Sequence, residues 1–574
     1  MFLFSSFNGF FDLIQRHYVF GFNCLFNILS DHMNYRFLFI LLGLMALFFS
    51  QLMAQDSYRD YQQMTDALQE LQDRYPDAVS LQSIATSPGG HEIWHVTIGT
   101  SEIERTPAMA IVGGADGAHI LGIEMALKLA ESLAEQVGTG ELPVQQVFHV
   151  FPNLNPDASE QYFSPVRYER SVNGKNTDLD RDGVSSEDPY DDLNGDGLIT
   201  MMRILDATGN WILHPDDDRV LIEADPLKSQ RGTYRLLTEG RDNDGDGHFN
   251  EDPAGGVNIN KNFTYQHPSF EYGAGEFPVS ESENRALVDL LYDTFNVYAV
   301  LSFTPNNNLS DPWQYSRSDA AKRVITGILE GDEGVYQSVS DLYKDLVPQH
   351  NASGYSLQPG GFPEWAYFHY ARYSFTTDGW WVPEVEAHDE QTNNGPASDE
   401  LNYLRWSESQ QLNSFTSWEQ VEHPDFPDQV VEVGGLHPFA MSAPPYSLVD
   451  SLADVHMEFV ERLSAMKPEL EFENIRVEDA GRNLTRITMD LHNSGSLPTS
   501  TELGTRTQWV RPLNIELEAG NSLQILSGRP EFQIERLMGG ESQDMSWLVS
   551  GSGTVTITAG SPSAGFATFE QTIR

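Results

Sequence analysis

Three short segments carry the residue types best suited to chemistry, because each alternates carboxylates or amides with other residues before a glycine. The segments run from Asp178 to Pro189, from Asp192 to Gly197 and from Asp242 to Pro253. Oxygen atoms spaced in this way converge on one hard cation, and the glycine permits the sharp turn, so the pattern predicts calcium. The predicted ligands are Asp178, Asp180, Asp182 and Glu187 in the first loop, Asp192, Asn194 and Asp196 in the second, and Asp242, Asp244, Asp246 and Glu251 in the third.

None of these acidic loops follows the regular EF-hand pattern, since Pro189, Arg203 or Pro253 stands where the bidentate glutamate would be. The alternative is a set of solvated acidic loops without an ion. Three repeats in one stretch favour calcium, and carboxylates left without a cation would repel one another and disorder the segment. We expect the calcium to be structural rather than catalytic.

The composition is strongly acidic. The chain has 84 Asp and Glu against 34 Lys and Arg, a net charge of -50, which repels nucleic acid and anionic lipid. Two explanations stay open: acidity that keeps an exported protein soluble, or adaptation to high salt. The single cysteine, Cys24, excludes a disulfide framework, so any metal must use oxygen and nitrogen ligands.

The first 55 residues resemble a leader. Met33 to Arg36 is a charged start, the apolar run from Phe37 to Phe49 is short, and Ala54 is a small residue near a cleavage point. We expect a signal peptide and a secreted or periplasmic protein, with translation beginning at Met33. The alternative is an uncleaved anchor, which the length of the run disfavours.

Helical and strand patterns alternate after the leader. Apolar residues recur at helical spacing before Pro76, and another helical stretch runs from about His119 to Leu133. This order predicts an α/β domain with a mixed, largely parallel sheet and flanking helices, and places chemistry at the strand ends. The predicted strands are 79–84, 93–98, 108–112 and 147–151.

The pattern changes twice along the chain. Residues 173–256 form an Asp- and Gly-rich insertion in a domain that spans 56–466. After about Lys467, short alternating strands with Gly and Ser turns predict a separate all-β sandwich domain over 467–574.

Residues 58–460 resemble the zinc carboxypeptidases of the carboxypeptidase A type. No serine-hydrolase elbow, His-Glu-x-x-His helix or phosphate-binding loop competes with this resemblance. It rests on several pieces in the family's order: Ser87 to Gly99, Asn155-Pro156-Asp157, Arg167 to Arg170, Asn258 to Phe263, Ser280 to Glu283, Leu301 to Phe303 with Asp311 to Trp313, and Gly360 to Asp378.

The resemblance implies a zinc site whose ligand positions are substituted. Asp116 stands where the family has its first histidine, His119 where it has a glutamate, and Thr304 where it has its second histidine. A neutral threonine is a poor zinc ligand. Asp378 takes the position of the general base, one methylene shorter than glutamate.

The residues implied to bind substrate match the family more closely than the implied zinc ligands do. Arg170 matches the arginine that stabilises the oxyanion. Asn260 and Lys261 stand where Asn and Arg bind a terminal carboxylate, and lysine keeps the charge without the two-pronged fork. Tyr367 matches the tyrosine that closes over the substrate. The resemblance therefore implies peptide C-termini as partners.

Three functions remain open. The first is a pseudoenzyme that binds peptide C-termini without cleaving them. The second is an active metallocarboxypeptidase with Asp116 and His119 on the metal and Asp378 as base, a set that His369 or His388 could complete. The third is hydrolysis of cell-wall peptides or amides on the same scaffold.

Overall fold

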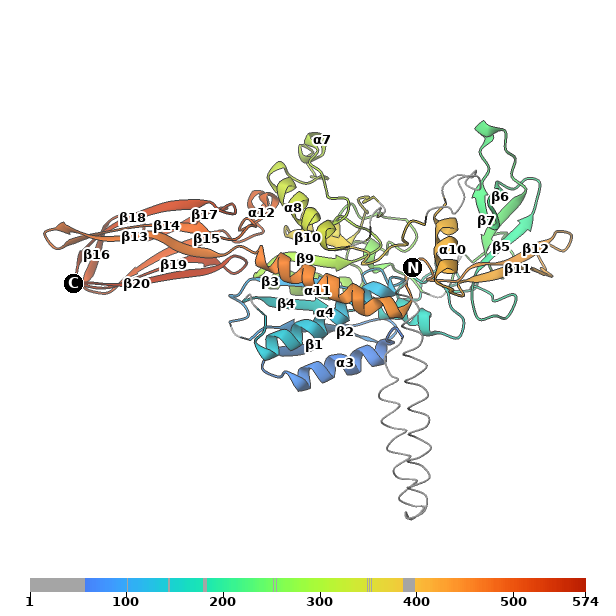
Figure 1. The fold of residues 1–574 in the computed structure, drawn as a ribbon, viewed down its shortest axis with the longest axis horizontal. Helices are drawn as coiled ribbons and strands as arrows, with labels where there is room; N and C mark the ends of the chain where they lie inside the picture. The colour runs from blue at the N-terminus through green and yellow to red at the C-terminus, as the bar shows by residue number, and fades with distance from the viewer. Residues whose placement is uncertain are drawn as a thin grey trace, which may run out of the picture. The chain divides into compact units, whose positions relative to one another are not determined.

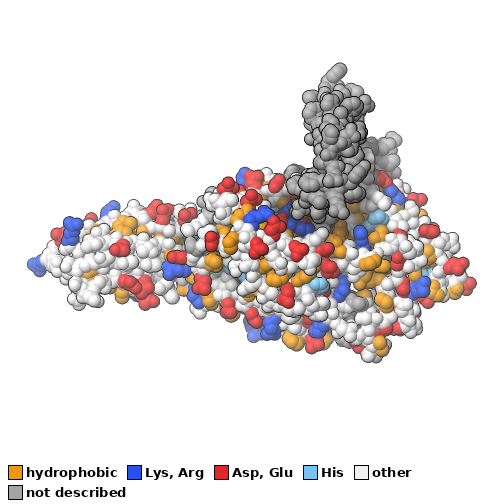
Figure 2. Space-filling model, turned by 90° about the horizontal axis from the view of Figure 1, so that it is seen from below, with side chains coloured by type: hydrophobic (Ala, Val, Ile, Leu, Met, Phe, Trp, Pro, Cys, Tyr) orange, Lys and Arg blue, Asp and Glu red, His pale blue; other side chains and the backbone are white. Residues whose placement is uncertain are grey.

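The computed structural model describes residues 57–100, 102–142, 145–178, 183–250, 252–253, 255–347, 349, 352, 354–385 and 398–574. The predicted leader lies outside these residues. Within them, no helix has the length and apolar character needed to cross a membrane. Acidic side chains are scattered over the face shown in Figure 2, with basic ones among them, and do not gather in one patch.

A central six-stranded sheet holds the core, in the order β1, β2, β4, β3, β9, β10 (Figure 1). β1, β2 and β4 pair antiparallel, whereas β4, β3, β9 and β10 pair parallel. The predicted mixed α/β sheet is confirmed, and the carboxyl ends of its parallel strands meet at one edge. The strands are β1 (Val79–Thr86), β2 (Glu92–Ile98), β3 (Ala108–Val112), β4 (Val147–Phe151), β9 (Val297–Phe303) and β10 (Tyr373–Thr377).

Every residue of β3, β4, β9 and β10 is buried, because helices cover both faces of this sheet. α3 (Tyr61–Arg74) and α11 (Val449–Ala465) pack on α4 (Ile120–Thr139). α6 (Ser282–Asp293) and α9 (Phe362–Phe368) share a hydrophobic cluster with alternate residues of β3. The remaining elements of this part are α5 (Pro156–Ser159), α7 (Arg317–Ala320), α8 (Glu330–Leu346) and the short 3-10 helices Glu160–Phe163, Pro226–Lys228, Ile259–Lys261 and Tyr446–Leu448.

A second six-stranded sheet, in the order β11, β12, β5, β8, β6, β7, was not predicted. Four of its strands come from the insertion and two from a segment about 200 residues later. Buried Met202 and Ile204 of β5 cluster with Val431 and Val433 of β12, which joins the two segments. The elements are β5 (Met201–Leu205), β6 (Trp211–His214), β7 (Asp217–Glu223), β8 (Tyr234–Thr238), α10 (Asp399–Ser409), β11 (Phe415–Val421) and β12 (Val431–Leu436).

The C-terminal strands form two antiparallel four-stranded sheets, in the orders β13, β14, β18, β16 and β17, β15, β19, β20. One hydrophobic cluster draws on both sheets, with Ile487 and Trp547 from the first and Ile515 and Ile557 from the second. The elements are β13 (Leu470–Gly481), β14 (Leu484–Asn493), α12 (Glu502–Thr507), β15 (Leu513–Ala519), β16 (Leu523–Ser527), β17 (Glu531–Ile534), β18 (Ser542–Gly551), β19 (Gly553–Ser561) and β20 (Gly565–Ile573).

Asp332 of α8 connects the C-terminal segment to the α/β part. Its side chain is fully buried and lies 2.9 Å from the guanidinium of Arg536. The same carboxylate accepts hydrogen bonds from the backbone N–H of Glu502 and from the hydroxyl of Tyr367. A buried carboxylate is tolerated here because a cation and several donors face it.

We expect Arg536→Ala to lower the free energy of unfolding by about 3–5 kcal/mol, because it leaves the Asp332 carboxylate buried without its cation. Urea unfolding measures this loss. Arg529→Ala removes an exposed arginine of the same region and should change stability little. Adding Asp332→Asn to Arg536→Ala should recover part of the loss, and equal effects of the two arginine variants would contradict the account.

Candidate functional site

The acidic loops share one local fold. In each, the carboxylate of the first aspartate accepts a hydrogen bond from the N–H of the glycine five residues later, and that glycine has a positive φ. The pairs are Asp178 with Gly183 at 3.0 Å (φ 104), Asp192 with Gly197 at 2.9 Å (φ 82), and Asp242 with Gly247 at 3.0 Å (φ 97).

The loop 242–253 brings Asp242, Asp244 and Asp246 together, with one carboxylate oxygen of each within 4.8 Å of the others. This set of oxygen donors has the chemistry that calcium requires. The loop 192–197 has the same turn, with Asn194 Oδ1 accepting from the N–H of Asp196 at 3.0 Å. Glu187 is half-buried in the first loop. The predicted ligands Asp180, Asp182 and Glu251 lie outside the described residues.

The first and third loops are also joined to each other, which the sequence pattern did not predict. The carboxylate of Asp188 accepts from the N–H of Asn243 at 2.9 Å, and that of Asp252 accepts from the N–H of Ser186 at 2.7 Å. Asp188 and Asp252 form an antiparallel bridge, and both are 1% exposed. Each aspartate therefore holds the backbone of the opposite loop.

His119 lies at the end of the loop after β3 and is 2% exposed. Its Nε2 donates to the backbone carbonyl of Asp378 at 3.1 Å. Its Nδ1 faces α4 at Gly122, where an added Cβ would lie only 2.5 Å away. Burial lowers the pKa of His119 to about 4, so the ring is neutral at pH 7. The bond to Asp378 engages Nε2 alone; Nδ1 is buried against α4 and is without a hydrogen bond to any described residue.

Thr304 follows β9 at the same edge of the sheet and is 1% exposed. Its hydroxyl lies 2.8 Å from the hydroxyl of Thr376 on β10. Thr376 in turn donates to the carbonyl of Asn306, so the Thr304 hydroxyl is the donor of the pair. A protonated hydroxyl engaged in this way is a weak metal ligand.

Asp116 is half-buried, and its Oδ1 accepts from the N–H of Ala118 at 3.3 Å. Burial raises the pKa of Asp116 to about 6; the nearby Glu169 raises it further, and Lys261 opposes the shift. Lys261 also lies 3.4 Å from the carbonyl of Tyr272.

Asp378 follows β10 and is half-buried. Its Oδ1 accepts from the side-chain amide of Asn307 at 2.9 Å, and the Asn307 oxygen accepts from the N–H of Ser310. Burial raises the pKa of Asp378 to about 7. Asn307, which the sequence did not single out, orients this carboxyl.

The substrate-side residues are held mainly by backbone groups. Arg170 donates from Nε to the carbonyl of Val172 at 2.9 Å and from one terminal nitrogen to that of Asn173 at 2.7 Å. Asn260, which is 4% exposed, accepts from the N–H of Phe362 at 2.9 Å. These contacts fix Arg170 against the backbone of residues 172–173 and Asn260 against the first residue of α9.

Tyr367 lies inside α9 and is fully buried, with its hydroxyl donating to Asp332 at 2.8 Å. Closing over a substrate would require α9 to leave the core. Tyr355, which the sequence did not single out, is half-buried on the loop before α9 and donates to Glu364. Because Tyr355 lies outside regular secondary structure, it is a better candidate than Tyr367 for a tyrosine that moves.

Comparison with known proteins matches part of the α/β domain to a known family. Residues 64–199 match the family model described as zinc carboxypeptidase. The predicted resemblance to the zinc carboxypeptidases is confirmed. Residues 469–572 match a model described as a domain of unknown function (DUF8731).

Among curated proteins, the chain is similar to carboxypeptidase SOL1 of Arabidopsis thaliana, with 30% identity over 169 residues, 27% of this chain and 33% of that protein. The chain thus spans about a third of the length of this relative.

Solved structures give weaker likenesses. Bovine thrombin-activatable fibrinolysis inhibitor in complex with tick carboxypeptidase inhibitor has 13% identity and a TM-score of 0.39, covering 71% of this chain and 97% of that one. Carboxypeptidase A from Helicoverpa armigera has 12% identity and a TM-score of 0.41, covering 71% and 74%. Both TM-scores are low, and the resemblance rests on the sequence matches.

Zinc is expected for this family, but the residues at its ligand positions do not fit it. His119 Nε2 and the Thr304 hydroxyl bond to Asp378 and Thr376, and both residues are buried, so Asp116 is the most accessible of the three ligand positions. Among the described residues, the groups of three His, Cys, Asp or Glu side chains with ligand atoms within 4.8 Å are Asp242, Asp244 and Asp246, and Glu471, Glu473 and His492. Neither group lies at the carboxyl edge of the central sheet. His369 bonds to Thr264 instead, and His388 lies outside the described residues.

We expect Asp378→Asn to be stabilising at high pH. The folded chain holds the Asp378 proton up to about pH 7, whereas an ordinary aspartate has a pKa of 3.8, so the wild type loses stability as pH rises between these values. The variant cannot ionise and should gain at most about 4 kcal/mol relative to wild type between pH 4 and pH 8.

Urea unfolding at both pH values measures this gain. The exposed Asp289→Asn on α6 is the matched control and should show no such pH-dependent gain. An Asp378→Asn variant whose pH dependence equals that of the wild type would contradict the buried state of this carboxyl.

Proposed function

We propose that this chain is an exported member of the zinc carboxypeptidase family that binds peptide C-termini and has lost, or strongly reduced, catalysis. The observation that carries the proposal is the hydrogen bond between the hydroxyls of Thr304 and Thr376. Thr304 takes the position of one zinc ligand of the family. His119 takes the position of another, and its Nε2 bonds to the carbonyl of Asp378. A zinc ion needs at least three protein ligands at a catalytic site.

Retained polar groups support binding. Lys261 and Arg170 keep positive charge at the positions that bind substrate in the family, and Asn260 is a buried amide next to Lys261 in the chain. The positive charge of Lys261 opposes the rise in the pKa of Asp116. A terminal carboxylate would meet both positive charge and hydrogen-bond donors there.

A second function is favoured by one observation. The pKa of Asp378, about 7, is suited to a general base at neutral pH. An active enzyme would need Asp116 and His119 to turn toward a metal, and Asp378 to activate water. The first proposal requires neither movement.

The rest of the chain supports binding rather than chemistry. We propose that the acidic loops hold calcium and stabilise the insertion 173–256, and that residues 467–574 form a β-sandwich domain after a carboxypeptidase-like domain over 56–466 and a leader over 1–55. The shared core of the two C-terminal sheets supports the sandwich.

Zinc content separates the two functions. Purified, calcium-loaded wild type should hold no stoichiometric zinc and release no C-terminal amino acids from a peptide panel. The triple variant Asp116→His, His119→Glu, Thr304→His restores the family's ligand types and should gain zinc by elemental analysis, whereas Thr304→Val should not. Stoichiometric zinc with chelator-sensitive release in the wild type would establish the active enzyme.

Binding should depend on the terminal carboxylate. A peptide with a free C-terminus should bind at least about 10-fold more tightly than its C-terminal amide, because a charged hydrogen bond contributes about 1.5–3 kcal/mol. Calorimetry measures both affinities. Lys261→Met should reduce the difference, and Lys228→Met, which removes an exposed lysine of the insertion, should leave it unchanged. Equal affinity for acid and amide would refute the binding proposal.

Calcium should raise the melting temperature, because an ion that binds only the folded chain stabilises it. The double variant Asp242→Asn, Asp244→Asn should reduce this rise, since it removes two of three convergent carboxylates. The control Asp345→Asn changes an exposed residue of α8 and should retain it. A calcium response that survives in the double variant would exclude the loop 242–253 as a site.

A further inference from the structure

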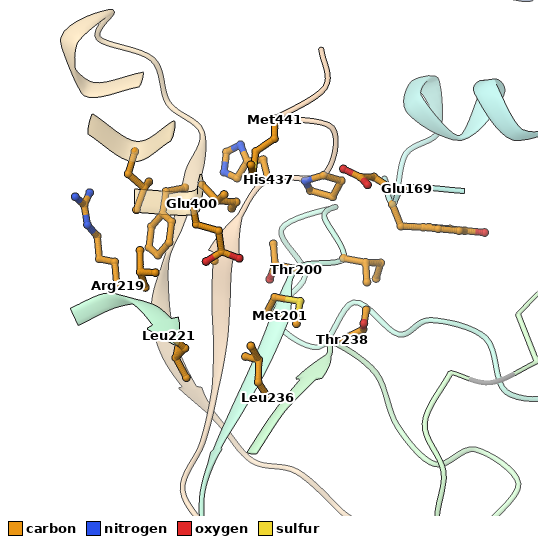
Figure 3. A pocket seen from close by; sticks show the side chains of 18 of the residues that line it. Glu169, Thr200, Met201, Arg219, Leu221, Leu236, Thr238, Glu400, His437 and Met441 are labelled. Carbon is orange, nitrogen blue, oxygen red and sulfur yellow. The ribbon is translucent and has the colours of Figure 1, made fainter. Parts of the chain in front are cut away.

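A cavity of about 510 Å³ opens between the second sheet, α10 and the segment that contains Tyr168 and Glu169. Its walls come from the insertion and from residues 400–442, so the two separate segments that build the second sheet also build the cavity (Figure 3). This volume lies within the range of about 300–1,000 Å³ typical of ligand pockets.

One part of the cavity wall is apolar. Met201 of β5, Leu221 of β7 and Leu236 of β8 contribute side chains from the sheet. Phe415 and Trp418 of β11 add aromatic surface. A wall of this kind favours an aliphatic group in contact with it.

The carboxylate of Glu400 is directed into this space. Figure 3 shows it extending from α10 toward Met201 and Leu236. Surrounding protein raises the pKa of Glu400 by desolvation, and the neighbouring Asp399 adds to the rise. A positively charged group in the cavity would relieve both effects.

Two arginines already have partners, of which Arg219 lines the cavity and Arg203 contacts Trp418 of its wall. Arg219 lies 2.6 Å from Asp217 and 2.7 Å from Glu408. Arg203 stacks on Trp418 and pairs with Glu432 at 2.8 Å.

Two titratable groups lie beside these charges. Burial lowers the pKa of His437, which keeps its ring neutral at pH 7. Glu169 carries a second negative charge at the wall of the cavity. The interior therefore favours a cation.

The cavity adjoins the candidate site. Tyr168 and Glu169 line it, and the next residue is Arg170. Glu169 also lies near enough to Asp116 to raise the pKa of that carboxyl. A peptide with its terminus near Lys261 would extend toward the cavity past Glu169.

We propose that this cavity binds the side chain of a lysine or arginine upstream of the C-terminus of the bound peptide. The aliphatic stem would lie on the apolar wall and the charged end on Glu400, the arrangement that long basic side chains prefer. The net charge of -50 adds a long-range attraction for basic peptides. This inference rests on the proposed binding of peptide C-termini and names the class of peptide.

The test uses the full calcium-loaded chain and peptides that carry one lysine, moved through each position upstream of a free C-terminus. Each peptide has a partner with norleucine, which keeps the stem and removes the charge. At one position lysine should bind at least about 10-fold more tightly than norleucine. Glu400→Gln should abolish this preference, while Glu419→Gln, on the exposed side of β11, should keep it. No lysine preference at any position, or a preference that survives in Glu400→Gln, would overturn the proposal.

A second probe separates this proposal from the function it rests on. Acetyl-lysine amide has no free terminus and should bind weakly, with a dependence on Glu400. If it does so while the peptides show no dependence on their terminal carboxylate, the cavity is upheld and the terminus site is refuted. If the terminal carboxylate matters and Glu400 does not, the cavity proposal alone fails.

Discussion

The hydrogen bond between Thr304 and Thr376 joins the carboxyl ends of β9 and β10 at the edge where the parallel strands of the central sheet meet. The backbone N–H of Thr304 also donates to the carbonyl of Thr377. Together these bonds extend the pairing of β9 and β10 to Thr304, the position at which the family has its second histidine ligand. A neutral hydroxyl held in this bond is a weak ligand for zinc.

The groups next to this hydrogen bond are also held in place. His119 is buried against Gly122 and bonds to the carbonyl of Asp378, and the carboxyl of Asp378 is held by Asn307. Burial then raises the pKa values of Asp116 and Asp378 toward neutrality. At pH 7 Asp116 is therefore mostly ionised and Asp378 about half ionised.

Local pattern predicted the central sheet well. The strands 108–112 and 147–151 match β3 and β4, because short, wholly apolar runs bounded by turns leave little ambiguity. The second sheet was missed because β11 and β12 lie far along the chain from β5, and their pairing depends on tertiary contacts.

The sequence predicted which residues lie at the site, but not the direction in which their side chains point. Motif order gave Asp116, His119, Thr304 and Asp378, and the structure adds where their donor atoms point. Tyr367 was chosen by its place in a motif, whereas burial inside α9 separates it from solvent. No sequence signal distinguishes a buried tyrosine in a helix from a mobile one on a loop when the two lie twelve residues apart.

The central claim is that the carboxyl edge of the sheet does not hold zinc. Anomalous diffraction recorded above and below the zinc absorption edge, on crystals grown with calcium and soaked in zinc, addresses it directly. The account predicts no zinc peak between Asp116 and His119, with the Thr304 hydroxyl still bonded to Thr376. A zinc peak in contact with Asp116 and a turned His119 ring would contradict it.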